Sequence, residues 1–419
     1  MLNSRINPSE IDKIKNINNI NKSLRQKNLE NFNNNGLPSK KDEDWKFSDL
    51  KKIFNQNFSN FKFDNNIINK KKINYVKDFD HNKIILINGE LKESDFNYED
   101  KNKIILKKFE EEQVSQEYRE NSLVSLNHAL SNKGFYLNIK DNYKFKKTLI
   151  IYNLFSIDLK NNFINNNNKI IIGKNSELHV IEYTINDSKS KFINNCFEKN
   201  ILKENSILRQ INLQANKSEG YFYKYLQSEL EKNSDYSGFI FSSGLKFNKI
   251  DMQFDLIGEK SNCKLLSGLF LTNNDHQEIK TRLNHLAPNC KSHQNIRNVL
   301  ESESKGIYQG KIFVKSVAQK TDAYQLSKGL ILSDQSEFNT KPELEIYADD
   351  VKCSHGSTSG NVDEDSIHYL MTRGLSKNQA VKLLINGFLS EILNQIKSET
   401  IKNFIETKLI EQINEYKIN

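Results

Sequence analysis

The feature that most constrains this fold is a long series of short apolar segments through the middle of the chain. Polar breaks between the segments recur at intervals of about 15 residues, near Lys291, Lys305, Thr321, Glu337 and Lys352. Asn, Gly, Ser and Asp cluster at the breaks, and runs such as "GIYQGKIFVK" between them have the composition of strands. A regular repeat of short strands is typical of a β-solenoid, in which each coil stacks on the one before it.

Two mainly β architectures fit this series: a β-sandwich or barrel, and a parallel β-solenoid. Periodicity alone leaves both open. Hairpin dipeptides such as Asn-Gly, which join antiparallel strands through tight turns, are missing between the strands, since Asn88-Gly89 lies outside the series. Their absence favours the solenoid. We therefore assign residues 146–360 to a solenoid core, residues 1–145 to a mixed N-terminal region and residues 361–419 to a helical C-terminal region.

The C-terminal region carries a strong helical signal. Ser376 and Gln379 fit a capping box, S-x-x-Q, at the start of a helix. Beyond this box, apolar side chains recur at i, i+3, i+4 and i+7; they are Val381, Leu384, Ile385, Phe388, Leu389, Ile392, Leu393 and Ile396. Such a stripe has to be buried, either by capping an end of the solenoid or by docking a partner protein.

The charge of the chain does not indicate a nucleic-acid partner. The formal net charge is +8, from 61 Lys and Arg against 53 Asp and Glu. Because the lysines are interspersed with acidic residues and no nucleic-acid motif is present, we expect a solvated surface with a basic tilt. Runs such as "NNFINNNNK" are attributed mainly to an A+T-rich coding sequence, with local loop disorder as the second interpretation.

The sequence also bears on the cellular compartment. No apolar run approaches the ~18 residues of a membrane span, and the N-terminal stretch lacks the apolar core of a secretion signal. The cysteines, Cys196, Cys263, Cys290 and Cys353, are far apart and form no C-x-x-C pair, so neither a disulfide framework nor a self-contained zinc site is expected. We expect a cytoplasmic protein with reduced thiols and no membrane partner.

A thiol and an imidazole two residues apart, Cys353 and His355, form the most distinctive candidate site. In a strand, residues i and i+2 share a face, so both side chains can approach one ligand. A thiolate and a neutral imidazole are both good ligands for iron. Two ligands alone make a weak site, so a stable centre needs further ligands from elsewhere in this chain or from another chain. The alternative is a partly buried strand in which Cys353 packs as a small hydrophobe.

Familiar catalytic motifs are missing from the chain. G-x-S-x-G, H-E-x-x-H and G-x-x-x-x-G-K-[ST] do not occur, so hydrolase, zincin and P-loop functions have no support. Glu343 and Glu345 share a strand face, but surface carboxylates are a commoner explanation than an acid/base pair. We expect this chain not to be an enzyme, and any ATPase involved to be another chain.

The stretch "KPELEIYADDVKCSHGSTSGNVDEDSIHYLMTRGLS", which contains Cys353 and His355, resembles the signature of the SufB/SufD family of iron–sulfur cluster assembly proteins, and within it the SufD branch. The residues before it are similar to the family's last β-helix coils, and "AVKLLINGFLSEIL" after it is similar to the family's C-terminal helix. Near the other end, "GLPSKKDEDWKFSDL" resembles the SufD signature around its tryptophan. The resemblance covers about residues 36–50 and 258–395.

This resemblance implies a right-handed parallel β-helix flanked by an N-terminal α/β region and a C-terminal helical region. It also implies a complex of one SufB, one SufD and two SufC ATPase subunits, in which the β-helices of SufB and SufD pair edge to edge. The C-terminal helices of SufD are expected to dock a SufC, which assigns this contact to Val381, Leu384, Ile385, Phe388, Leu389 and Ile392. A homodimer stays open for the chain in isolation.

The resemblance also implies what the site binds. A transient iron–sulfur cluster, or iron, is expected at the SufB–SufD interface, where this subunit contributes to iron acquisition and de novo cluster assembly. His355 is the expected ligand from this chain, and Cys353 is the less secure one because a thiol there also fits packing. A reduced flavin is open for the complex, and no cofactor is expected to stay bound to this chain alone.

Departures from the SufB pattern favour the SufD branch. Gly356 follows His355 where SufB carries Glu, and Gln325-Leu326 stands where SufB has its scaffold cysteine. One alternative, a SufB-like scaffold acting as a homodimer, would therefore lack its own cluster cysteines. The other alternative, a stand-alone β-helix carbohydrate-active enzyme, would need carboxylates and a basic residue clustered on one coil face.

Overall fold

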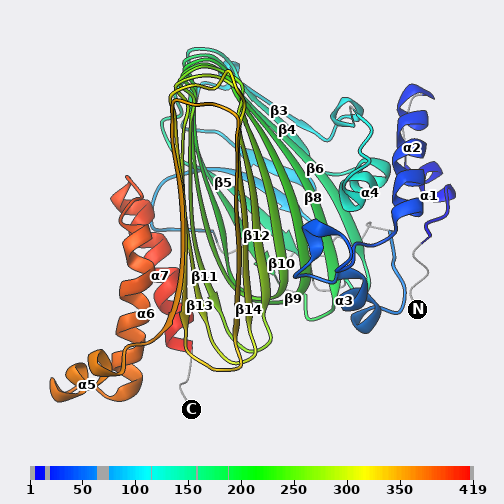
Figure 1. The fold of residues 1–419 in the computed structure, drawn as a ribbon. Helices are drawn as coiled ribbons and strands as arrows, with labels where there is room; N and C mark the ends of the chain where they lie inside the picture. Colours follow the sequence, from blue (N-terminus) through cyan, green and yellow to red (C-terminus); the bar gives the residue numbers. More distant parts are fainter. Residues whose placement is uncertain are drawn as a thin grey trace.

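The computed structural model describes residues 5–14, 19–63, 75–114, 116–156, 159–186 and 188–415. A parallel β-helix forms the centre of the molecule. The N-terminal and C-terminal helices lie on opposite sides of it (Figure 1). The predicted solenoid is therefore confirmed, and a sandwich or barrel of antiparallel strands is excluded, because the strands of successive coils pair in parallel.

Two parallel sheets, A and B, form the walls of the solenoid. Sheet A contains, in order, β5 (Leu149–Phe155), β7 (Glu177–Asn186), the first halves of β9 (Ile207–Leu230) and β10 (Asp235–Leu256), β11 (Asn262–Leu271), β13 (Lys291–Leu300), β15 (Thr321–Ile331) and β17 (Val351–Asn361). Sheet B contains β4 (Phe135–Ile139), β6 (Phe163–Ile172), β8 (Phe192–Leu202), the second halves of β9 and β10, β12 (His276–His285), β14 (Lys305–Val314) and β16 (Glu337–Ile346).

Three further strands join the sheets at the N-terminal end: β1 (Asn82–Ile87), β2 (Glu90–Asp95) and β3 (Ile104–Lys108). β1 pairs in parallel with β5 and antiparallel with β2, and β3 pairs antiparallel with β4. The first of the named strands thus begins at Asn82, inside the N-terminal region, and Lys62 already forms an isolated parallel bridge with Asn162.

The 15-residue spacing of polar breaks marks the starts of single strands. β13, β14, β15 and β16 begin at the predicted breaks, and β17 begins one residue before the break predicted near Lys352. Most coils therefore contain two strands, one in each sheet. β9 and β10 differ because each continues from sheet A into sheet B as one long strand.

Asparagine has a structural role that composition did not reveal. The run "NNFINNNNK" belongs largely to β6, where Asn165 to Asn168 are buried, so the interpretation of this run as loop disorder is wrong. At the turns, Asn142, Asn175, Asn205 and Asn233 all have positive φ, between 55° and 58°. Asn tolerates this left-handed conformation better than most residues. Side-chain amide hydrogen bonds of 2.9–3.0 Å link these four turns into a ladder.

Apolar side chains pack on three surfaces of the solenoid. The largest cluster fills the interior between sheets A and B, from Ile84 at the N-terminal end to Tyr308 near the last coils. A second cluster joins the outer face of sheet A to the C-terminal helices. A third joins the outer face of sheet B to the N-terminal segments. Because both faces of many strands are buried, their polar residues are buried as well.

The N-terminal segments on sheet B include α1 (Ser9–Asp12), α2 (Asn19–Asn35), α3 (Leu50–Asn57), α4 (Ser122–Leu130) and the short 3₁₀ turns Glu43–Trp45, Lys101–Lys103 and Glu111–Gln113. The Glu43–Trp45 turn crosses several strands of this sheet. The Trp45 ring lies 4.6 Å from Lys249 Nζ on β10, and Asp44 and Glu43 pair with lysines on β12 and β16, Lys280 and Lys341. The segment around the only tryptophan therefore ties neighbouring coils together.

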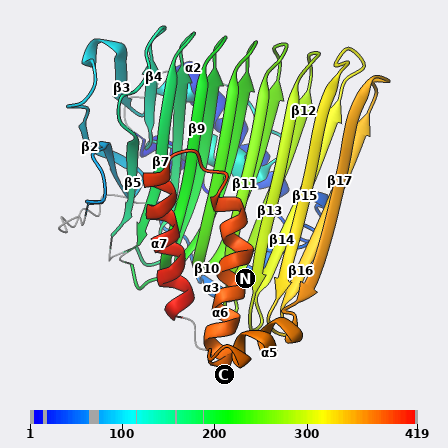
Figure 2. The same cartoon turned by 90° about the vertical axis from the view of Figure 1, so that its left-hand side faces the viewer.

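The C-terminal helices are α5 (Glu364–Thr372), α6 (Lys377–Leu393) and α7 (Glu399–Glu415). The predicted capping box is present: Gln379 N donates to Ser376 Oγ at 3.3 Å, and Ser376 N donates to Gln379 Oε1 at 2.9 Å. α6 and α7 lie across the outer face of sheet A (Figure 2). They cover the side of the solenoid rather than its end, because that face carries the apolar residues of the second cluster.

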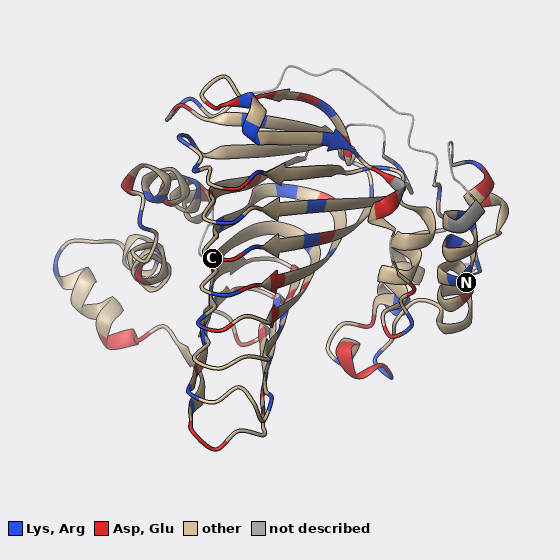
Figure 3. Ribbon diagram, turned by 90° about the horizontal axis from the view of Figure 1, so that it is seen from above, with Lys and Arg blue, Asp and Glu red and all other residues tan. Residues whose placement is uncertain are grey.

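Acidic and basic residues are interspersed along the coils (Figure 3). Many of them form ion pairs between neighbouring coils, such as Lys199–Glu229 at 2.7 Å and Lys203–Glu231 at 2.7 Å. In the part of the chain that the structure describes, no helix combines the length and the apolar character needed to cross a bilayer.

Candidate functional site

Cys353 and His355 lie on β17, at the end of sheet A. β17 pairs with β15, and no described strand pairs with its other edge (Figure 2). In sheet B, β16 is in the same position, paired with β14 alone among the described strands. The solenoid therefore ends in two strands that each keep one row of backbone N–H and C=O groups free of strand pairing.

Both side chains of the candidate pair face the interior of the solenoid. Cys353 is in register with Ala323, and His355 is in register with Gln325. Ala323 and Gln325 are each only 1% exposed, and residues in register on neighbouring parallel strands point to the same face. The prediction that the thiol and the imidazole share a strand face is therefore confirmed, and that face opens at the last coil.

The two side chains differ in exposure. Cys353 is half-buried and packs against the small cluster that contains Ile312 and Ala323, whereas His355 is exposed. Burial raises the pKa of the Cys353 thiol, which favours the protonated form. A bound metal ion would replace that proton, as it does at other thiolate sites.

Polar side chains continue inward from His355. Ser357 Oγ lies 3.0 Å from Ser327 Oγ, which lies 3.0 Å from Thr340 Oγ1 on β16. One coil deeper, Tyr308 Oη lies 3.3 Å from Gln325 Oε1. The sequence pattern did not single out Ser327, Thr340 or Ser357, because Ser and Thr within strands resemble turn residues until the register is known.

The chain does not complete a metal site by itself within its described residues. No group of three or more His, Cys, Asp or Glu side chains there is arranged to hold a metal ion. Cys196, Cys263 and Cys290 are buried elsewhere in the solenoid, and burial raises the pKa of each of their thiols. If Cys353 and His355 bound a metal ion, the described residues would therefore supply no more than these two His, Cys, Asp or Glu ligands as a group.

Glu343 and Glu345 lie on the outer face of β16. Glu343 pairs with Lys341 at 3.2 Å, and Glu345 pairs with Lys311 at 2.5 Å. The hydrogen bond from Lys311 lowers the pKa of Glu345. These carboxylates have the partners of ordinary surface ion pairs, and nothing in their surroundings supports acid/base catalysis.

The apolar stripe of α6 packs against the chain's own sheet. All six residues expected to dock a partner belong to the cluster with Phe239 and Leu266 on sheet A. Val381, Ile385, Leu389 and Ile392 are buried within it, and Leu384 and Phe388 pack against it. Arg297 of β13 reinforces the contact, since its Nη1 donates to Phe388 O at 2.6 Å. The stripe's own sheet therefore occupies the face that the periodicity identified.

Three apolar side chains of α5 and α6 are exposed. Tyr369 and Met371 on α5 are 57% and 44% exposed, and Leu383 on α6 is 50% exposed. We call these three residues the α5–α6 surface. Sequence periodicity missed them, because they lie off the apolar stripe.

Comparison with known proteins agrees with this architecture. Residues 155–388 match the family described as "SUF system FeS cluster assembly, SufBD core domain", and residues 9–151 match "SufBD protein N-terminal region". The iron–sulfur cluster assembly protein SufD of Escherichia coli is 33% identical over 37% of this chain and 36% of its own length. An iron–sulfur cluster assembly SufBD family protein of Synechocystis is 29% identical over 56% of this chain and 51% of its own length.

The SufD of Plasmodium falciparum is 26% identical over 73% of this chain and 21% of its own length. The matched segments thus span between about a fifth and about half of these relatives. Because the two family matches together run from residue 9 to residue 388 with a short gap, the chain belongs to the SufBD family of iron–sulfur cluster assembly proteins.

Proposed function

We propose that this chain is a SufD-type, non-ATPase subunit of an iron–sulfur cluster assembly complex, and that it acts through the open end of its solenoid. The observation that carries the proposal is the position of Cys353 and His355 on β17, a strand whose second edge has no described partner. Inward-facing ligands beside an unpaired edge suit a site that is completed by a second protein.

The partner at this end is a SufB-type subunit. An exposed edge strand binds another strand through main-chain hydrogen bonds, and β16 and β17 offer two such edges side by side. A coil of similar geometry would extend both sheets at once. A second copy of this chain could use the same edges, so a homodimer is the competing outcome for the protein in isolation.

Iron or a nascent iron–sulfur cluster is the cargo of the shared site, held only in passing. His355 is exposed and is the first ligand that incoming iron meets. Cys353 follows, because its thiol has to lose a proton when it binds the metal. Since two ligands fall short of the four that bind a tetrahedral iron, SufB supplies the remainder.

A SufC-type ATPase docks on the α5–α6 surface. This assignment replaces the α6 stripe, which is covered by sheet A, with the exposed side chains of Tyr369, Met371 and Leu383. The buried stripe then has a second role, because it fastens α6 to the sheet that ends in β17. Movement of the ATPase would reach the cargo site through this contact.

The test is co-expression of this chain with its cognate SufB and SufC. Wild type, His355→Ala and Ser354→Ala are compared for complex formation by size-exclusion chromatography and for iron–sulfur absorbance. Ser354 is the matched control, because it neighbours His355 on β17 and points to the other face. We expect all three complexes to form and only His355→Ala to lose the cluster.

Two outcomes would contradict the proposal. If His355→Ala gave as much cluster as wild type, Cys353 and His355 would have only a packing role. A wild-type chain that stays a homodimer in the presence of SufB would refute the assignment of the open end to a SufB-type partner.

A further inference from the structure

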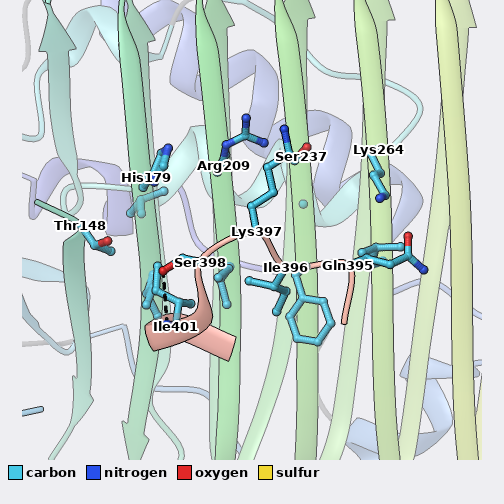
Figure 4. Close-up of a pocket in the computed structure, with 16 residues that line it drawn as sticks. Thr148, His179, Arg209, Ser237, Lys264, Gln395, Ile396, Lys397, Ser398 and Ile401 are labelled. Carbon is cyan, nitrogen blue, oxygen red and sulfur yellow. Dashed lines mark hydrogen bonds between the residues drawn. The ribbon is translucent and has the colours of Figure 1, made fainter. Parts of the chain in front are cut away.

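A cavity of about 110 Å³ lies between the outer face of sheet A and the segment that joins α6 to α7. Figure 4 shows Gln395, Ile396, Lys397 and Ser398 crossing over the strands at this point. We call the cavity the α6–α7 pocket. It is separate from the open end of the solenoid, because its floor comes from β7, β9, β10 and β11.

One wall of the pocket is a row of side chains in strict register. His179 is paired with Arg209, Arg209 with Ser237, and Ser237 with Lys264. Adjacent strands are about 4.8 Å apart, so Arg209 and Lys264 flank the small Ser237 from opposite sides. Lys397 on the crossing segment adds a third permanent cation to the lining (Figure 4).

These cations form no ion pair among the described residues, although the nearby charge of Asp235 acts on Lys264. By contrast, His179 pairs with Glu177 at 2.8 Å. Asp235, the other nearby carboxylate on the strands, accepts a hydrogen bond from Asn262. Burial, and then the charge of Lys397, lower the pKa of Lys264, as expected where like charges gather.

The row of residues next to the cations is apolar. Ile211, Phe239 and Leu266 are in register on β9, β10 and β11, two residues beyond the charged row, and each is at most 8% exposed. Ile401 at the start of α7 lines the pocket from the opposite side. The pocket therefore combines a cationic edge with an apolar floor.

We propose that the α6–α7 pocket binds a small organic anion, a carboxylate with a compact apolar body. The carboxylate lies between Arg209, Lys264 and Lys397, where its single negative charge offsets part of the repulsion among the three cations and accepts charge-assisted hydrogen bonds from them. The body packs on Ile211, Phe239 and Leu266. An apolar cavity of about 150 Å³ accommodates benzene, so a partly open pocket of about 110 Å³ suits a ligand with a single ring or a short branched chain.

Benzoate is the probe, titrated calorimetrically into the full chain. Three comparison compounds separate the contribution of the negative charge from that of the ring. Benzyl alcohol has the ring without the charge, benzylamine has the ring with the opposite charge, and inorganic phosphate has negative charge without the ring. We expect benzoate to bind more tightly than all three. If benzyl alcohol bound as tightly as benzoate, the pocket would not recognise the negative charge. If phosphate bound as tightly as benzoate, the pocket would not recognise the apolar part of the ligand.

Variants locate the binding site. We expect Lys264→Met to weaken benzoate binding about tenfold, the effect of losing one charge-assisted hydrogen bond. Lys291→Met, which removes an exposed lysine of β13 from the same outer face of sheet A, should leave binding unchanged. Ser237→Phe fills the hollow between the two cations and should abolish binding. Retained binding in Ser237→Phe, or equal losses in Lys264→Met and Lys291→Met, would overturn the proposal.

Discussion

Truncating the side chain of Leu389 tests which face of α6 packs against the chain's own sheet A. Leu389 is 1% exposed and lies over Gly268 of β11, where an added Cβ would come within 3.4 Å of Leu389 Cδ2. Leu389→Ala removes three buried carbon atoms, worth about 2.4 kcal/mol of transfer free energy at about 0.8 kcal/mol each. The cavity left behind adds to this loss, so we expect about 3 kcal/mol of destabilisation, within the range of buried Leu→Ala changes.

Leu383→Ala is the matched control, because it makes the same chemical change on the same helix. Leu383 is 50% exposed, so we expect a loss of about 0.5 kcal/mol or less. Urea unfolding of the isolated chain measures both variants, and co-purification with the cognate SufC measures docking. We expect Leu389→Ala to lower the unfolding midpoint and Leu383→Ala to leave it nearly unchanged. A third variant, Leu383→Asp, places a charge on the α5–α6 surface, and we expect it to lose SufC binding.

The reverse pattern would refute this reasoning. If Leu389→Ala left the free energy of unfolding unchanged and abolished SufC binding, α6 would turn its apolar stripe toward the ATPase and sheet A would not cover it. If Leu383→Asp bound SufC as wild type does, the α5–α6 surface would not be the docking site.

Three further changes test other parts of the structure. Lys249→Met leaves Glu278 buried without its counter-charge, so we expect a loss of about 3–5 kcal/mol in urea unfolding, part of which Glu278→Gln should restore. Burial lowers the pKa of His285 to about 4, so between about pH 6.5 and about pH 4 the unfolded chain binds more protons than the folded one. The free energy of unfolding should therefore fall as the pH drops through this range, by up to about 1.4 kcal/mol per pH unit. His285→Leu should remove this contribution to the pH dependence. Gly134→Ala would place a Cβ 1.9 Å from a backbone oxygen at φ +125° and should lower the melting temperature sharply, whereas Gly360→Ala, with nothing within 4 Å of the added atom, should not.

The sequence predicted the features that repeat or depend on local chemistry. The starts of β13 to β17 followed from the spacing of polar breaks, because each coil needs a turn after a fixed length of strand. The start of α6 followed from Ser376 and Gln379, because a capping box is local: each of the two side chains bonds to the backbone N–H of the other residue.

Features that depend on what covers a face were harder to predict. In β6, Asn166 faces the solenoid interior while Asn167 lies under the N-terminal segments, so a buried strand looks like a polar loop in sequence. The stripe of α6 had to be buried, but periodicity cannot tell whether sheet A or another protein buries it. The register of sheet A decides this, because it places Phe239 and Leu266 side by side beneath the helix.

The last three inward side chains in one row of sheet A are polar. Along one row of sheet A, the inward side chains in register are Leu265, Gln294, Gln325 and His355. A solenoid normally needs a polar cap at each end, since an uncovered apolar coil would aggregate. A covering cap would also block the free edges of β16 and β17. Polar side chains at the end of this row lessen both problems, because they tolerate water and leave the edges free to pair, while Leu344 and Val351 keep another part of the last coil apolar. His355 is the last described member of this row, so the row ends with an imidazole at the place where the proposed partner would join.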